Sequence, residues 1–236
     1  MMNEFIADVG YFSVAFALIL FFLISRLQQK CKINGLKPLL NPLVITVVIT
    51  IVCLVLTGST YESFNEGAKY VTWFLTPTTV CLAIPLYEKI GYLKKEPAAI
   101  MTAILAGIFT SAVSILGMAV LFGISQAEYI TMLPKSVTAA VGMDLSAALG
   151  GYEAITMAAI TVTGLLGNVT ATYVFKLFRI TDPVARGLAL GNAAHAMGTS
   201  RAAELGKTEE AMSSLAMGVA GLLTVLVAAL FSMISV

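Results

Sequence analysis

The sequence predicts an all-α, polytopic integral membrane protein. Of its 236 residues, 58% are hydrophobic and only 11% are charged, whereas soluble domains carry about 25% charged residues. Several charge-free apolar stretches approach the length of about 20 residues that a helix needs to cross a bilayer. The chain has room for about seven or eight such transmembrane helices.

The first apolar stretch, residues 11–25, is expected to stay in the membrane as an anchor. Glu4 and Asp8 precede it, where a cleaved signal peptide would carry Lys or Arg. The loop that follows is basic and holds no acid, so the positive-inside rule places it in the cytoplasm. Its basic residues are Arg26, Lys30, Lys32 and Lys37.

Three further stretches, residues 42–57, 70–90 and 98–122, are also expected to cross the membrane. The first leads to a short acidic segment with Glu62 and Glu66, which should face outside. The second contains two prolines, each of which removes a backbone donor and clashes with the preceding turn, so we expect a kink or an interruption there. These prolines are Pro77 and Pro85.

Two later segments, residues 133–151 and 182–206, do not resemble ordinary spans, because both are short, rich in Gly and Ala, and studded with polar residues. We interpret them as broken or re-entrant segments. Ordinary spans are expected at 152–175 and 212–234. If 133–151 dips into the membrane and returns outside, the later basic loops fall inside, as the charge rule prefers. A full crossing would lose that agreement.

An internal repeat is suggested by laying residues 77–107 on 134–164 at a constant offset of 57. Transporters built from internal repeats show such a duplicated unit, a Pro-interrupted segment leading into a Gly-containing span. Chance also matches Ala, Val and Gly in membrane chains, so the repeat stays one of two interpretations. The matched pairs are Pro77 with Pro134, Val80 with Val137, Ala83 with Ala140 and Gly107 with Gly164, and Thr79 falls on Ser136.

All these segments are expected to form a single membrane domain, 1–236. Residues 1–37 would be the anchor helix with its basic cytoplasmic loop, and residues 38–236 a transporter-like core. The formal net charge is +1, from 14 basic and 13 acidic residues. A chain with so little excess charge is not expected to bind nucleic acid.

A first candidate site surrounds Pro134. Lys135, Ser136 and Thr138 lie there in a stretch apolar enough for membrane depth, where a lysine persists if it faces a cavity, a partner or an anionic ligand. We expect Pro134 to open a half-helix whose free N–H groups and nearby hydroxyls point at a carboxylate. The alternative is that Lys135 snorkels to the interface and Pro134 merely starts a helix.

A second candidate site lies between residues 186 and 202. One helix face there holds only small residues and lets another backbone approach closely; it consists of Gly187, Gly191, Ala194 and Gly198. An adjoining face forms a polar stripe that would line a cavity; it consists of Asn192, His195 and Thr199, and it ends at Ser200 and Arg201. The second site is therefore predicted to contact the substrate, and the small face to pack a helix.

Two further features have alternative interpretations. His195, the one histidine, titrates near neutral pH and would couple protons to transport, or it is a neutral hydrogen-bond donor between helices. It has no second ligand for a metal. Asp144 and Glu153 would bind Na⁺ or H⁺, or they mark the aqueous end of a hairpin. Motifs of catalytic or cofactor-binding sites are absent from the sequence, so we expect no enzyme and no cofactor.

Four sequence blocks resemble the LrgB/CidB family. They are PLYEKIG at 85–91, PKSVT at 134–138, RGLALGNAAHAMGTSRA at 186–202 and SSLAMGVAG at 213–221. The resemblance covers nearly the whole chain. It implies a multi-pass protein of the bacterial inner (cytoplasmic) membrane, similar to the antiholin-like partner of a small LrgA/CidA-type holin-like protein, and control of murein hydrolases and autolysis.

The same family includes the plastid glycolate/glycerate translocator and bacterial members linked to pyruvate uptake. The resemblance therefore implies transport of short hydroxy- or oxo-monocarboxylates, which agrees with an anion site at Lys135. The alternative function is a regulator that binds a holin-like protein through the small-residue face and transports nothing itself. The sequence leaves the oligomeric state open, a homo-oligomer included.

Overall fold

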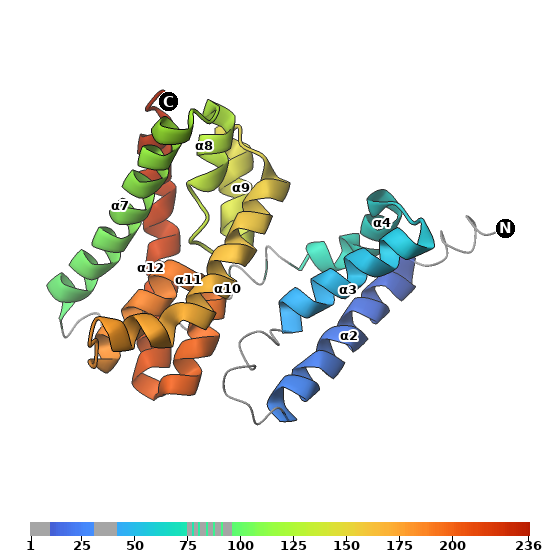
Figure 1. Ribbon diagram of the computed structural model, residues 1–236, viewed down its shortest axis with the longest axis horizontal. Helices are drawn as coiled ribbons and strands as arrows, with labels where there is room; N and C mark the ends of the chain where they lie inside the picture. Colours follow the sequence, from blue (N-terminus) through green and yellow to red (C-terminus); the bar gives the residue numbers. More distant parts are fainter. Residues whose placement is uncertain are drawn as a thin grey trace. The chain divides into compact units, whose positions relative to one another are not determined.

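The structure is a computed structural model that describes residues 10–30, 42–74, 77, 80, 84, 87, 91 and 96–236. The regular elements in these residues are all helices, so the all-α class is confirmed (Figure 1). By contact, the chain divides into two compact units, Met1–Thr78 and Thr79–Val236. The expected single membrane domain stays a prediction.

The first unit contains α2 (Gly10–Lys30), α3 (Pro42–Thr57) and α4 (Tyr61–Thr72). Helix α2 packs against both α3 and α4. The acidic segment expected after residue 57 lies within α4. This helix begins after Thr60, whose side chain caps it by accepting a hydrogen bond from the Ser63 N–H. The expected interruption at Pro77 and Pro85 falls in a stretch that lies almost entirely outside the described residues.

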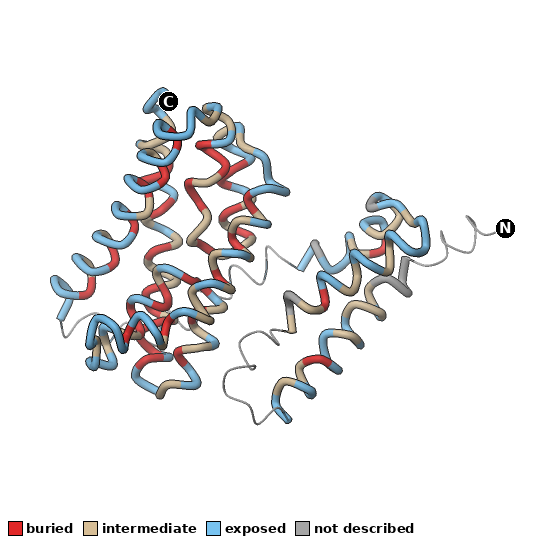
Figure 2. The backbone as a smooth tube through the Cα atoms, viewed as in Figure 1, coloured by how far each residue is buried: buried red, intermediate tan, exposed pale blue. Residues whose placement is uncertain are grey.

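Three helices of the second unit are long and apolar enough to cross a bilayer: α7 (Pro97–Phe122), α10 (Glu153–Leu177) and α12 (Lys207–Ser232). They are the three that qualify among the described residues, so the expected total of seven or eight spans stays a prediction. Helix α7 packs against α12, and buried positions follow one side of it while exposed ones follow the other (Figure 2). That asymmetry suits a helix between a protein core and lipid.

Between α7 and α10 the chain forms a hairpin of two short helices, α8 (Gln126–Met132) and α9 (Ala139–Leu149), joined by a non-helical turn at 133–138. The returning end is fixed to the outgoing one, since the Tyr152 N–H donates to Thr131 Oγ1 at 2.8 Å. The buried Thr156 hydroxyl donates to the Thr131 carbonyl oxygen at 2.9 Å. Segment 133–151 therefore returns to the level of α8.

Helix α11 (Pro183–Leu205) begins at Asp182, whose carboxylate accepts from the Ala185 N–H. It is broken in the middle, because His195 has φ 42° and ψ −130°, values outside the helical region. The two halves approach each other so closely that a Cβ on Gly198 would lie 2.1 Å from the Leu190 carbonyl oxygen. The break gives segment 182–206 a bend with close backbone contact.

Helix α11 packs against α12 along much of its length. A Cβ on Gly187 would lie 2.5 Å from the Glu209 carbonyl oxygen, and one on Gly191 only 2.1 Å from that of Ser213. Gly187, Gly191, Ala194 and Gly198 are all buried. Gly187 and Gly191 thus allow α11 and α12 to pack backbone to backbone.

Candidate functional site

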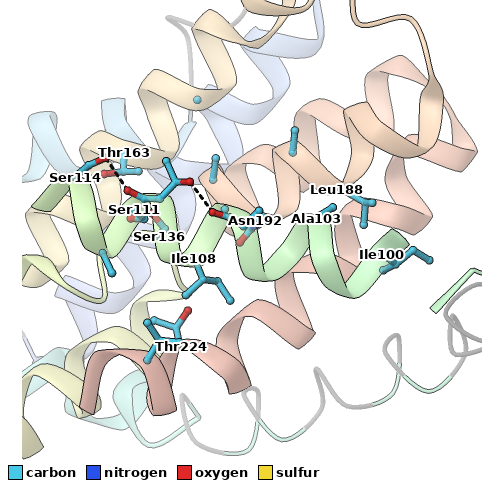
Figure 3. Close-up of a pocket in the computed structure, with 18 of the residues that line it drawn as sticks. Ile100, Ala103, Ile108, Ser111, Ser114, Ser136, Thr163, Leu188, Asn192 and Thr224 are labelled. Carbon is cyan, nitrogen blue, oxygen red and sulfur yellow. Dashed lines mark hydrogen bonds between the residues drawn. The ribbon is translucent and has the colours of Figure 1, made fainter. Parts of the chain in front are cut away.

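The second unit contains a cavity of about 1270 Å³. Its walls come from α7, the turn at 133–138, α10, the first half of α11, and α12 (Figure 3). Ser111, Ser114, Ser136, Thr163 and Asn192 gather in one part of it, and apolar residues line α7 farther along. The polar lining residues within the described ranges are Glu96, Thr110, Ser111, Ser114, Lys135, Ser136, Thr163, Asp182, Asn192 and Thr224.

Among the described residues, Lys135 is the one basic residue that lines this cavity. Its ammonium donates to Ser111 Oγ at 3.1 Å and to Ser136 Oγ at 3.2 Å. An ammonium has three N–H donors, so one of them remains for a ligand. Lys135 makes no ion pair within the described part of the chain. A mostly buried cation without a counter-ion favours the binding of an anion.

The acidic residues of the cavity lie far from Lys135. Glu96 lies at the start of α7, 15 residues before the Ser111 that Lys135 contacts, which is about 22 Å along a helix. Asp182 is used in capping α11, ten residues before Asn192. Neither carboxylate neutralises the ammonium.

Asn192 projects from α11 onto α7. Its side-chain Nδ2 donates to the Ile104 carbonyl oxygen at 2.9 Å. The contact requires a glycine at position 107, since a Cβ there would lie 2.1 Å from Nδ2. Gly107 and Ser111 are one turn apart, about 6 Å on the same face of α7. The Asn192 amide and the Lys135 ammonium thus both contact α7, at neighbouring turns of this helix.

The turn that carries Lys135 differs from the expected half-helix. Pro134 is fully buried within the turn, and helix α9 begins only at Ala139. The expectation that Pro134 opens the half-helix is therefore wrong, because the chain needs residues 133–138 to reverse direction between α8 and α9. Thr138 is the N-cap residue, yet its buried hydroxyl has no partner in the described residues and does not line the cavity.

His195 lies at the break in α11, and its side chain contacts α10. Its Nε2 is 3.1 Å from the Ile160 carbonyl oxygen, and its ring covers Gly164, where a Cβ would be 2.7 Å from Cε1. The Asn168 amide donates to the Met197 carbonyl oxygen at 2.9 Å, beside the same break. His195 does not line the cavity, and its contact with a carbonyl oxygen requires a proton on Nε2, so the ring acts as a hydrogen-bond donor between helices.

The rest of the expected polar stripe is dispersed by the break. Thr199 donates to the His195 carbonyl oxygen and contacts Ser213 Oγ of α12 at 2.9 Å. Ser200 is exposed. Arg201 pairs with Glu204 and donates to Thr172 Oγ1 of α10 at 2.7 Å. Of the expected substrate-contacting residues, the cavity therefore collects Lys135, Ser136 and Asn192.

The small-residue face expected to dock a partner protein is covered within the same chain. Helix α12 lies on Gly187 and Gly191, Ala194 lies against Gly167 of α10, and Gly198 lies against Leu190 of its own helix. Asp144 and Glu153 are both exposed, as expected for the aqueous end of a hairpin rather than for a buried cation site. No group of three His, Cys, Asp or Glu side chains able to hold a metal lies within the described residues.

Sequence reasoning missed Ser111, Thr163 and the role of Gly107 in this cavity. Ser111 and Thr163 lie in apolar spans, where hydroxyls often bond to their own helix. Thr110 does so by donating to the Ala106 carbonyl oxygen. The one available signal was Gly107, which the offset of 57 pairs with Gly164.

The chain is similar to proteins of one known family. The model of the LrgB-like family matches residues 17–234. Two relatives, both named holin-like protein CidB, come from Staphylococcus epidermidis strains ATCC 35984 and ATCC 12228. Each is 35% identical over 216 residues, which is 92% of this chain and 92% of the relative. No solved structure matches. The expectation from the four sequence blocks is confirmed, and the chain belongs to the LrgB-like family.

Proposed function

We propose that this protein is a membrane carrier for small monocarboxylates and not an enzyme. The observation that carries the proposal is Lys135, a mostly buried ammonium in a cavity, bonded to two hydroxyls and paired with no carboxylate in the described residues. A pure docking protein has no need of such a charge in a membrane segment. A carboxylate ligand would supply the missing counter-charge.

The two interrupted segments support a carrier. Residues 133–138 interrupt the α8–α9 hairpin, and His195 interrupts α11. Transporters commonly place such broken elements at their binding sites. Gly107 of α7 and Gly164 of α10, matched by the offset of 57, each lie beneath a polar side chain of α11, Asn192 and His195 respectively. This correspondence favours the internal repeat.

The proposed compartment is the bacterial inner membrane, and the proposed partner is a small LrgA/CidA-type protein. Both follow from the holin-like name of the relatives and from the family. Because the chain itself covers the small-residue face of α11, the partner would bind another surface.

The experiment is uptake of labelled pyruvate, glycolate and glycerate into proteoliposomes, with this protein alone and then with the small partner, under an imposed proton gradient. Saturable uptake is expected. Lys135→Met should lower uptake at low substrate by about 30-fold or more, because it leaves the carboxylate without its buried counter-charge. The control is Lys176→Met, at an exposed site at the end of α10, which should leave uptake unchanged. Equal uptake by both variants would refute the role of Lys135.

The second candidate function is antiholin-like control of murein hydrolases and autolysis, favoured by the holin-like name of the relatives. It predicts changes in lysis without substrate flux. If no condition gives flux, and the Lys135→Met variant still controls lysis with the partner present, the regulator becomes the better function.

A further inference from the structure

The orientation of the Asn192 amide is fixed by its contact with α7. A backbone carbonyl oxygen only accepts hydrogen bonds, so the side-chain nitrogen must face Ile104 and the side-chain oxygen must face away. None of the described residues bonds to Asn192 Oδ1, and Oδ1 is not among the fully buried unpaired atoms. Since Asn192 lines the cavity, it presents a free acceptor there.

That acceptor differs from the described hydroxyls in the polar part of the cavity, because an amide oxygen only accepts, whereas a hydroxyl both donates and accepts. The Lys135 ammonium only donates, and the hydroxyls of Ser111 and Ser136 already accept from it. On α7, the Lys135 ammonium bonds to Ser111, and the Asn192 amide, bonded to Ile104, lies over Gly107, one turn or about 6 Å along the helix from Ser111. A ligand with a carboxylate at one end and a hydroxyl on the adjacent carbon has the length to reach both.

We propose that Asn192 Oδ1 selects 2-hydroxy monocarboxylates over the corresponding 2-oxo acids, with Lys135 holding the carboxylate. The inference rests on the proposed carrier function and specifies its substrate class. A hydroxyl donates its proton to Oδ1. An oxo group has no proton to donate, so it places one acceptor against another and leaves Oδ1 without a partner, which lowers affinity.

Gly107 acts as a positioning residue in this scheme. A side chain at 107 would displace the Asn192 amide from the Ile104 carbonyl, because the added Cβ would lie 2.1 Å from Nδ2. Gly117, on the same helix, has open space at the equivalent Cβ position. Gly107→Ala and Gly117→Ala are therefore a matched pair, and only the first should alter selectivity.

The test compares lactate with pyruvate, a pair that differs only at the second carbon. Uptake is measured in proteoliposomes, and the shift in melting temperature that each acid causes is measured on the purified protein. The native protein should favour the hydroxy acid by about tenfold or more. Asn192→Leu and Gly107→Ala should abolish that preference, and Gly117→Ala should keep it.

The outcomes separate this inference from the carrier function. The selectivity is overturned if the native protein takes up both acids at equal rates, or if Asn192→Leu loses uptake of both acids equally. Either result leaves the carrier function intact. Absence of uptake overturns the carrier, and the melting shifts then decide the selectivity at Asn192 by themselves. Equal or absent shifts overturn it. If Asn192→Leu does not fold, Gly107→Ala, which keeps the asparagine, decides.

Discussion

Single residues without side chains determine much of this structure, since three glycines set the distance between helices. Gly107 admits the Asn192 amide, Gly164 admits the His195 ring, and Gly191 admits the backbone of α12. Gly191 tolerates the least change, because the atom nearest to an added Cβ is a backbone oxygen that cannot rotate away.

Gly191→Ala should destabilise the protein by about 1–3 kcal/mol, the usual cost of overpacking. The added methyl group would lie 2.1 Å from the Ser213 carbonyl oxygen, so α11 and α12 must separate. Thermal unfolding in detergent measures the effect. Gly221→Ala on α12 is the control, because nothing lies within 4 Å of its Cβ position. Equal melting temperatures for both variants would contradict the close packing of α11 on α12.

The sequence indicated Lys135 and Asn192 for simple physical reasons, a charge and an amide in apolar surroundings. It did not indicate how they are combined. The stripe of Asn192, His195 and Thr199 assumed a continuous helix, and the break at His195 turns the later residues away from the cavity. A positive φ at a non-glycine residue depends on tertiary contacts, so local sequence does not reveal it.

At the scale of elements, buried hydroxyls hold the α8–α9 hairpin to α10. Thr131, Ser146 and Thr156 are fully buried. The Thr156 hydroxyl donates to the Thr131 carbonyl oxygen and lies 2.7 Å from Ser146 Oγ. Short helices of this length are not stable alone, so the turn that carries Lys135 depends on these bonds.

Thr156→Val should therefore lower stability by about 1–3 kcal/mol, since it leaves buried polar groups without a partner. Uptake should fall as well, because the turn at 133–138 is no longer held in place. Thr170→Val, on the same helix, removes a hydroxyl that bonds only to its own helix at Leu166 and is exposed. If chemical denaturation shows the same loss for both variants, the buried network is not what fixes the hairpin.

The start of α8 should respond to pH. Hydrogen bonds from the Ser125 hydroxyl and from its backbone N–H lower the pKa of Glu128 below its ordinary value of 4.5. A lowered pKa means that the charged carboxylate stabilises the folded state above pH 4.5 and that this contribution is lost as the pH falls through the lowered pKa. Glu128 lies outside the three spanning helices.

Glu128→Ala should accordingly lower the melting temperature at neutral pH, and the difference from the native protein should shrink as the pH falls through the lowered pKa. Melting curves of both proteins at neutral pH and along an acid series measure it. A difference that persists unchanged in acid would mean that the carboxylate contributes by packing and not by its charge.

Helix positions were largely predictable, because long apolar stretches have few alternatives. The expected spans 98–122 and 152–175 became Pro97–Phe122 and Glu153–Leu177. Helix α12 starts at Lys207, five residues before the expected span. The expected span began later because Lys207, Glu209 and Glu210 make the first turn of the helix too polar to be recognised as membrane sequence. Hydropathy detects the apolar part of a helix and not its capped ends.

At the scale of the second unit, the basic residues other than Lys135 lie at one of its two ends. The Gln126 side chain donates to the carbonyl oxygens of Ser232 and Ile234, so the start of α8 and the end of α12 lie together. Near the other end, Arg186 donates to the Ile180 carbonyl oxygen, and Gly187 contacts Glu209 at the start of α12. The basic residues from 96 to 236, apart from Lys135, belong to that second end: Lys176, Arg179, Arg186, Arg201 and Lys207.

This distribution predicts orientation, because cytoplasmic loops carry the basic residues. In a variant without the native cysteines, a cysteine at Tyr152 should react with a membrane-impermeant reagent in intact cells. A cysteine at Lys207 should react only after permeabilisation. Labelling of both sites, or of neither, in intact cells would contradict a hairpin that returns to its starting side.

The composition was sufficient to predict the all-α class of the second unit, and hydropathy predicted the order of its long helices. The cavity was not predictable, because its walls come from residues as distant in sequence as Gly107 and Asn192, and no local pattern encodes their meeting. The four sequence blocks identified the family, since this comparison uses many positions at once and does not depend on how they are arranged in space.

The unpaired charge of Lys135 also has an electrical consequence. In the proposed carrier, the empty site bears one positive charge, and a bound monocarboxylate neutralises it. Moving one elementary charge through the full membrane potential changes the free energy by about 2.3 kcal/mol per 100 mV. The empty carrier would therefore sense the voltage during its return while the loaded carrier would not, and the membrane potential would bias the direction in which the empty site faces.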